Sequence, residues 1–175
     1  ARDAKIKAQF TAAGVEAKSF NGALLHEPHT IANKQGGPFQ VFTPYWRHCL
    51  TLPVAPATKL GPRPLPAPDA WPKSLALAQL ELLPRLPWAD GFAGQWEPGE
   101  AGAQRRLKQF AAEAMSHYTD ARNLPGRDGT SRLSPHLHFG EISPRQVWAA
   151  VQAQSRDSGV FPPSKGAGVF LAEIG

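Results

Sequence analysis

The sequence has very little cysteine: Cys49 is its only one among 175 residues. An internal disulfide framework is therefore excluded, and this composition fits a reducing compartment. No apolar run approaches the roughly 18 residues that a membrane span requires, and the first residues contain no apolar core of a signal peptide. From these absences we expect a soluble protein of the cytoplasm.

The excess of positive over negative charge is also small. The chain has 19 Lys and Arg against 14 Asp and Glu, which gives a net charge of +5. Such a balance is compatible with a polyanionic partner, but many basic proteins bind no nucleic acid. The charge by itself therefore does not identify a partner.

Proline is abundant but unevenly placed. Ten of the 18 prolines lie between Pro53 and Pro98. Chain of this kind is extended and semi-rigid, so residues 51–100 are predicted to be a linker, with one short helix between Leu75 and Leu86. Tryptophan is amphipathic and gains from burial, so the Trp residues within this linker predict that it packs across a surface. They are Trp71, Trp88 and Trp96.

Residues 1–50 resemble the end of an α/β domain. Ile6 and Phe10 lie at helical spacing within residues 2–13, and Gly14 follows as a stop. The alternating segment Val15–Phe20 predicts a short strand, and a helix followed by a strand is typical of the last unit of a parallel sheet. We expect the rest of that domain to precede Ala1, in a longer protein.

A further helix is predicted near the end of this first region. Thr43 is suited to cap it, with Pro44 at the first helical position, where the missing N–H costs nothing.

From residue 101 to residue 175 the pattern is helical. One amphipathic stripe is formed by Leu107, Phe110, Ala111, Ala114 and Tyr118. Ser143 and Gln146 form a capping box around Pro144, which predicts a second helix. A final helix is predicted to start between Ser164 and Gly168.

Polar chemistry is concentrated in one loop of this region. Asp128-Gly129 is a turn pair that places Thr130 and Ser131 before Arg132, and Ser134 is suited to cap the next helix. Hydroxyls, free amides and a guanidinium together suit an anion such as a phosphate ester. The alternative is an ordinary turn and cap with a solvated arginine.

The histidines do not predict a metal site. His136 and His138 are two residues apart, so on a helix they point to nearly opposite sides. Packing or surface positions are favoured for both. His26 and His29 could form an acid–base cluster, although a polar loop is the simpler interpretation.

Three ordered elements resemble the photolyase and cryptochrome family. The central one is Tyr118, then Arg122, then residues 130–134 continuing into Pro-His-Leu-His-Phe-Gly-Glu-Ile-Ser-Pro-Arg. Upstream, Val41-Phe-Thr-Pro-Tyr-Trp46 matches the Val-Phe-Thr-Pro-aromatic element that precedes the family's interdomain linker. Downstream, Val169-Phe-Leu-Ala-Glu-Ile174 resembles the helix that continues into Trp-Arg-Glu-Phe.

This resemblance implies a domain plan. Residues 1–50 would be the C-terminal remnant of the antenna domain, residues 51–100 the interdomain linker, and residues 101–175 the beginning of the all-α FAD-binding domain. The fold class is then mainly α. The rest of the flavin pocket would follow Gly175, so we expect a piece of this length to be inactive alone.

The resemblance also implies residue roles. The FAD contacts would be Tyr118, Thr130, Ser131, Arg132, Leu133, Ser134 and Phe170, and Phe170 stands where the family usually has Trp. Arg122 would contact the DNA backbone. Glu173, the one catalytic residue of this set, would face the pyrimidine dimer. No residue would bind a metal.

The implied activity is light-driven, FAD-dependent repair of cyclobutane pyrimidine dimers by a monomer acting on damaged DNA. The same elements fit a cryptochrome, which signals without repair, and a phosphate-binding helical module remains a third interpretation. A second, antenna chromophore is compatible with the family. Where some members have Asn-His-Glu for a folate antenna, this chain has Gln35-Gly36-Gly37, without a carboxylate. The resemblance therefore does not support a folate held in that way.

Overall fold

The computed structural model describes residues 2–57, 64, 66–92 and 94–175. Its helices are α1 (Arg2–Ala12), α2 (Phe42–Cys49), α3 (Glu100–Glu113), α4 (Tyr118–Ala121), α5 (Ser134–His138), α6 (Pro144–Ser158) and α7 (Lys165–Ala172). Short 3₁₀ helices accompany them: η1 (Pro28–Thr30), η2 (Leu77–Leu80), η3 (Pro87–Phe92) and η4 (Met115–His117). The predicted mainly α fold class is confirmed. None of the described helices is long and apolar enough to cross a bilayer.

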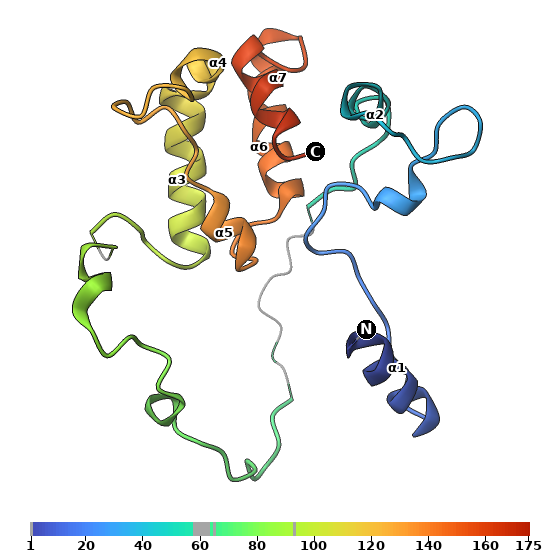
Figure 1. Cartoon of the computed structure of the whole chain (residues 1–175), viewed down its shortest axis with the longest axis vertical. Coiled ribbons are helices and arrows are strands. Elements are labelled where there is room, and N and C mark those ends of the chain that lie inside the picture. Colours follow the sequence, from blue (N-terminus) through green and yellow to red (C-terminus); the bar gives the residue numbers. More distant parts are fainter. Residues whose placement is uncertain (1, 58–63, 65, 93) are drawn as a thin grey trace.

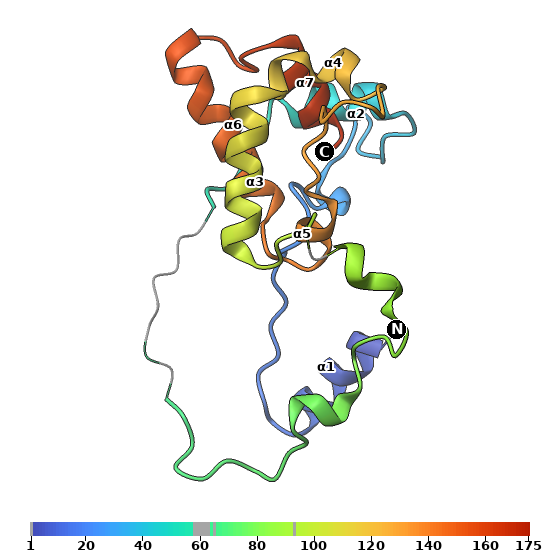
Figure 2. The ribbon, with the colours of Figure 1, turned by 90° about the vertical axis from the view of Figure 1, so that its left-hand side faces the viewer.

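Helices α3 to α7 gather into one body, and α2 lies beside them in both views (Figures 1 and 2). Its core is built from side chains that are almost fully buried, among them Leu107, Phe110, Leu133, Ile142, Val147, Val151 and Leu171. Trp46 of α2 packs edge-on against Trp148 of α6, with 6.2 Å between the ring centroids. The helix before the linker therefore shares a core with the helices after it.

Two helix starts agree with the sequence predictions, one for a capping box and one for the position of the start. Ser143 Oγ accepts a hydrogen bond from the Gln146 amide at 3.2 Å, and Gln146 Oε1 accepts one from the Ser143 amide at 2.8 Å. At α7, Ser164 Oγ accepts from the Ala167 amide at 3.1 Å. These bonds satisfy amides that have no partner inside the helix. The predicted capping box and the predicted start of the last helix are both confirmed.

Two other predicted caps are wrong. Helix α2 begins at Phe42 after Val41, so Thr43 lies inside the helix. Phe42 stacks on Trp46 at 6.3 Å, and this one-turn contact favours a helix that already includes Phe42. Ser134 is the first residue of α5, whose cap is the buried Leu133. In both cases packing of an apolar side chain overrides the local capping preference.

The predicted stripe from Leu107 to Tyr118 is divided between helices. Helix α3 ends at Glu113, Ala114 leaves the helical region, and η4 connects it to α4. The turn allows Met115 to be buried and brings η4 against α7. Tyr118 therefore begins a new helix, which faces α7.

The N-terminal prediction is half correct. Helix α1 is present and ends before Gly14, whose φ of +72° suits a helix stop. The predicted strand Val15–Phe20 is wrong, because residues 15–20 are extended but no strand pairs with them in the described part of the chain. A strand needs the hydrogen bonds of a neighbouring strand. Helix α1 lies apart from the helical body in both views (Figures 1 and 2).

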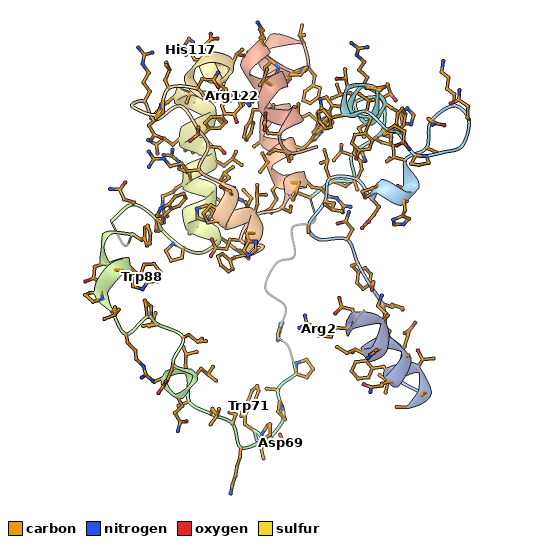
Figure 3. All side chains as sticks on the ribbon, viewed as in Figure 1. Arg2, Asp69, Trp71, Trp88, His117 and Arg122 are labelled. Atoms are coloured by element: carbon orange, nitrogen blue, oxygen red, sulfur yellow. The ribbon has the colours of Figure 1, made fainter. Side chains whose placement is uncertain are left out.

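Part of the predicted linker, residues 58–63, 65 and 93, lies outside the described residues. Leu52 and Val54, at its start, pack against the core, and most of the described remainder runs as an arc away from the helical body (Figure 1). The predicted helix at Leu75–Leu86 reduces to η2, which ends where Glu81 adopts a φ of +46°. Trp71 and Trp88 are 76% and 69% exposed, so the prediction that they pack on a surface is wrong here (Figure 3). Trp88 contacts Phe92 within η3, whereas Trp96, the third tryptophan of this prediction, is half-buried.

Candidate functional site

Three aromatic rings from three helices meet where α4 packs against α7. The Phe170 ring lies 4.6 Å from that of Phe110 and 5.4 Å from that of Tyr118, measured between centroids. Phe110 and Tyr118 meet edge-on at 5.6 Å. Phe110 and Phe170 are buried, whereas Tyr118 is half-buried. The predicted site residues Tyr118 and Phe170 are thus brought together, with Phe110 beneath them.

A charged pair closes the exposed side of this aromatic cluster. Arg122, which follows α4, donates from Nη1 to Glu173 Oε1 at the end of α7, 51 positions along the chain. The guanidinium carbon of Arg122 lies 5.6 Å from the Tyr118 ring centroid, within cation–π range. Both side chains are partly exposed, and Arg122 lies at the outer end of the helical body (Figure 3). The two residues predicted to meet DNA are therefore neighbours.

The surroundings of the cluster shift the pKa of two of its members, Tyr118 and Arg122. Burial raises the pKa of Tyr118, and the Glu173 carboxylate raises it further, while Arg122 acts in the opposite direction. The hydrogen bond to Glu173 raises the pKa of Arg122. Tyr118 is therefore a neutral hydrogen-bond donor at neutral pH, and Arg122 is a fixed cation.

The loop from Asp128 to Ser131 is held by an arginine of α3. Arg106 Nη2 donates to Asp128 Oδ1 at 2.7 Å, and Nη1 donates to Oδ2 at 3.1 Å. Arg106 also donates to the carbonyl oxygens of Ser131 and Thr130, at 3.0 and 3.1 Å. The hydrogen bond from Arg106 lowers the pKa of Asp128, and the charges of Arg106 and Arg132 add to this effect. Asp128 is therefore ionised at neutral pH.

The residues predicted to bind an anion come next in the chain. Arg132 has a φ of +51°, and its Nε lies 3.1 Å from Asp128 Oδ1. The side chains of Thr130 and Ser134 are exposed, and no hydrogen bond within the described residues engages their hydroxyl groups. Leu133, by contrast, is 1% exposed and belongs to the core. The loop thus presents two unengaged hydroxyls beside a half-buried cation.

A hydrogen-bonded pair with one buried member, His136, follows the loop. His136 Nδ1 lies 2.5 Å from Glu141 Oε2, and the His136 side chain is 5% exposed. Because a carboxylate accepts, the imidazole donates, and this bond lowers the pKa of Glu141, with the backbone of Gly99 adding to the effect. His138 is exposed. No cluster of potential metal ligands occurs among the described residues.

A cavity of about 270 Å³ lies between α3 and the start of α5. Its lining includes Trp96, Arg106, Arg132 and His136. It adjoins the loop but not the cluster of Tyr118, Arg122, Phe170 and Glu173. The predicted site residues are therefore found in two groups, one at the α4–α7 contact and one around residues 128–134.

Two residues that bind members of the site were not predicted from the sequence, namely Arg106 and Glu141. Arg106 follows Ala103 by three positions and precedes Phe110 by four, and both of these are buried. This spacing places Arg106 on the edge of the buried face, which is a signal for a cation with an internal partner. Glu141 comes five positions after His136, beyond the end of α5, so helix periodicity gives no signal for that pair.

Comparison with known proteins identifies relatives of this chain. The family model described as DNA photolyase matches residues 1–69. The deoxyribodipyrimidine photo-lyase of Agrobacterium fabrum (strain C58) is 44% identical over 159 residues, which cover 89% of this chain and 33% of that protein. Cryptochrome-1 of Arabidopsis thaliana is 30% identical over 187 residues, or 99% of this chain and 26% of that protein.

A solved structure is also similar. The crystal structure of a bacterial class III photolyase from Agrobacterium tumefaciens matches with a TM-score of 0.84 and 39% sequence identity. The match covers 99% of this chain and 35% of that one, so the chain spans about a third of the length of the photolyase. The fold is thus that of one part of a photolyase. The chain belongs to the DNA photolyase and cryptochrome family.

Proposed function

We propose that the protein to which this chain belongs is a deoxyribodipyrimidine photolyase, a monomer that uses FAD and light to repair cyclobutane pyrimidine dimers in DNA. The observation that carries this proposal is the 44% identity to the Agrobacterium fabrum photo-lyase over 89% of the chain. The meeting of Tyr118, Arg122, Phe170 and Glu173 at one contact supports it. When bound, reduced FAD would supply in the light an electron that opens the cyclobutane ring and then returns to the flavin.

The loop residues fit a phosphate-bearing cofactor. The unengaged hydroxyls of Thr130 and Ser134 and the cation of Arg132 can donate hydrogen bonds to the oxygens of a diphosphate. Ser131 is half-buried, and the deeply buried Leu133 would contribute through its backbone. Tyr118 and Phe170 would shape the apolar end of the site and exclude water from it.

Arg122 and Glu173 would act on the DNA side. Arg122 is the cation that would bind a backbone phosphate, and such contacts position DNA without reading its sequence. Glu173 would face the damaged bases, which must leave the duplex stack to be reached. Because Arg122 and Glu173 pair with each other in this structure, phosphate binding by Arg122 would free the Glu173 carboxylate for the lesion.

A cryptochrome is the second candidate. It is favoured by the 30% identity to Arabidopsis cryptochrome-1 over 99% of the chain. It would have the same cofactor site and no repair activity.

Two measurements on the purified full-length protein to which this chain belongs separate these functions. The first is its flavin absorption spectrum, and the second is light-dependent loss of dimers from an irradiated oligonucleotide. Flavin together with repair is the expected result. Flavin without repair would favour the cryptochrome. Absence of flavin would contradict both and favour a phosphate-binding module.

Replacing Arg132 with alanine is expected to lower FAD occupancy about tenfold, because a charge-assisted hydrogen bond to the diphosphate is lost. Occupancy is measured as the ratio of flavin to protein absorbance after purification. Arg85→Ala is the matched control, since Arg85 is exposed and pairs with Glu81 in the linker. Equal occupancy in Arg132→Ala and the control would exclude Arg132 from the cofactor site.

Replacing Arg122 with alanine is expected to weaken DNA binding about tenfold for every sequence tested, because one phosphate contact is lost. The slope of log affinity against log salt should fall by about 0.9. Fluorescence anisotropy with several duplexes measures both quantities. Arg85→Ala removes the same charge from an exposed ion pair in the linker and should change neither. A loss confined to particular sequences would contradict the phosphate assignment.

A further inference from the structure

Arg106 is the main polar anchor of the loop that precedes α5. Its side chain is only 19% exposed, although it carries a permanent charge. No backbone–backbone hydrogen bond reaches residues 128–132 within the described chain. The carbonyl groups of Thr130 and Ser131 are instead bound by the Arg106 guanidinium. A side chain of another helix therefore takes the place that backbone hydrogen bonds have in most turns.

All five N–H donors of Arg106 are engaged. Nε bonds Ser131, Nη2 bonds Asp128 and Thr130, and Nη1 bonds Asp128 and reaches Gln109 Oε1 at 3.4 Å. A guanidinium has five donors and no acceptor, so none remains for a ligand. Arg106 therefore holds other residues of the protein in place.

Asp128 is shared between two arginines, and the sharing is unequal. It accepts two hydrogen bonds from Arg106 but only a single Nε approach, at 3.1 Å, from Arg132. Without Arg106, the Asp128 carboxylate would be free to pair fully with Arg132. That pairing would remove the cation from any anion bound at the loop.

Two features show how closely the loop is constrained. Gly129 is buried, and a Cβ at this position would lie 2.6 Å from the Ala121 side chain of α4. Arg132 has a φ of +51°, which is unfavourable for a residue with a side chain. A conformation of this kind persists only where surrounding contacts impose it, and the bonds from Arg106 to the preceding carbonyl groups of Thr130 and Ser131 are contacts of that kind.

We propose that Arg106 is a positioning residue: it sets the backbone of residues 128–132 and, by holding Asp128, leaves Arg132 available to a diphosphate. The ligand half of this inference, that Arg132 is left available to a diphosphate, rests on the proposed function. The loop half does not, because it concerns only contacts within this chain. The two halves are therefore tested by different measurements.

The loop half is tested by limited trypsin digestion of the protein, with cleavage after Arg127 and Arg132 followed by mass spectrometry. Arg106→Gln is expected to raise the cleavage rate at both bonds about tenfold, because a loosened loop enters the protease more often. Arg106→Lys should behave similarly, since one ammonium cannot replace a planar fork with five donors. Arg105→Gln, on the same helix, should match the unaltered protein. Unchanged cleavage in both Arg106 variants would overturn the proposal.

The ligand half is tested with inorganic pyrophosphate as the probe, by isothermal titration. Arg106→Gln is expected to weaken binding about tenfold, and adding Asp128→Asn should recover most of that loss by releasing Arg132. A role in stability alone would give no such recovery, so its absence would overturn the release of Arg132. Failure of the unaltered protein to bind pyrophosphate would overturn the ligand half. If the protein binds pyrophosphate but does not bind FAD, this would contradict the proposed function and support the role of Arg106.

Discussion

Replacing Gly166 with alanine is expected to reduce the free energy of unfolding by about 3 kcal/mol, the upper part of the usual range for overpacking. A Cβ at this position would lie 2.1 Å from the Met115 carbonyl oxygen and 2.6 Å from that of Ser116. Both atoms belong to backbone, so neither can rotate away. Helix α7 would have to move off η4.

The displacement would also reach the candidate site. Phe170 follows Gly166 by one helical turn, and Glu173 lies just beyond the end of the same helix. Moving α7 away from η4 should therefore separate Phe170 from Tyr118 and Glu173 from Arg122. We expect the flavin content to fall together with stability.

Gly168→Ala is the matched control in the same helix. Its Cβ would meet the Pro162 ring, with Cγ at 3.5 Å and Cβ at 3.9 Å, which is ordinary contact. Alanine is also a better helix former than glycine, so this variant should gain up to about 1 kcal/mol. Urea unfolding followed by circular dichroism measures both changes. Equal stability of the two variants would contradict the close approach of α7 to η4.

Replacing Phe170 with alanine is expected to reduce the free energy of unfolding by about 3–5 kcal/mol, as for other buried aromatic side chains. The ring is 3% exposed and lies between Phe110 and Tyr118. Its removal would leave a cavity at the α3–α4–α7 contact and would forfeit two aromatic contacts. Thermal unfolding followed by circular dichroism measures the loss.

Phe139→Ala is the control for that variant, because Phe139 is 74% exposed. Its effect should remain within about 0.5 kcal/mol, as for most surface substitutions. A small effect at both positions would mean that Phe170 is not part of the core. Phe170 would then be available as an exposed wall of the site.

Local pattern predicted the helices well where a cap or a stop lies beside an apolar stripe. Ser143 and Gln146 cap α6, Ser164 caps α7, and Gly14 follows α1 as expected. These features depend on residues within four positions of each other, so sequence alone contains them. The caps at Thr43 and Ser134 failed because Phe42 and Leu133 pack against the rest of the chain and move the helix boundary.

The candidate site was predicted as residue types and roles, and those roles remain proposals. Tyr118, Arg122, Phe170 and Glu173 came from the resemblance to the family, and the structure brings them to one contact. The resemblance did not indicate Arg106. Its spacing from Ala103 and Phe110 places it at the edge of the buried face, but only the tertiary structure shows that its partner is Asp128, 22 positions away.

The sequence by itself determined that this chain is mainly helical, that a proline-rich segment separates its two ends, and that residues 128–134 concentrate polar chemistry. Each of these follows from composition or from spacing within a few turns. The tertiary structure decided that residues 15–20 form no strand, that the stripe breaks at Ala114, and that Arg122 meets Glu173 across 51 positions. Such outcomes depend on which distant surfaces pack together, and packing between distant segments leaves no periodic signal in the chain.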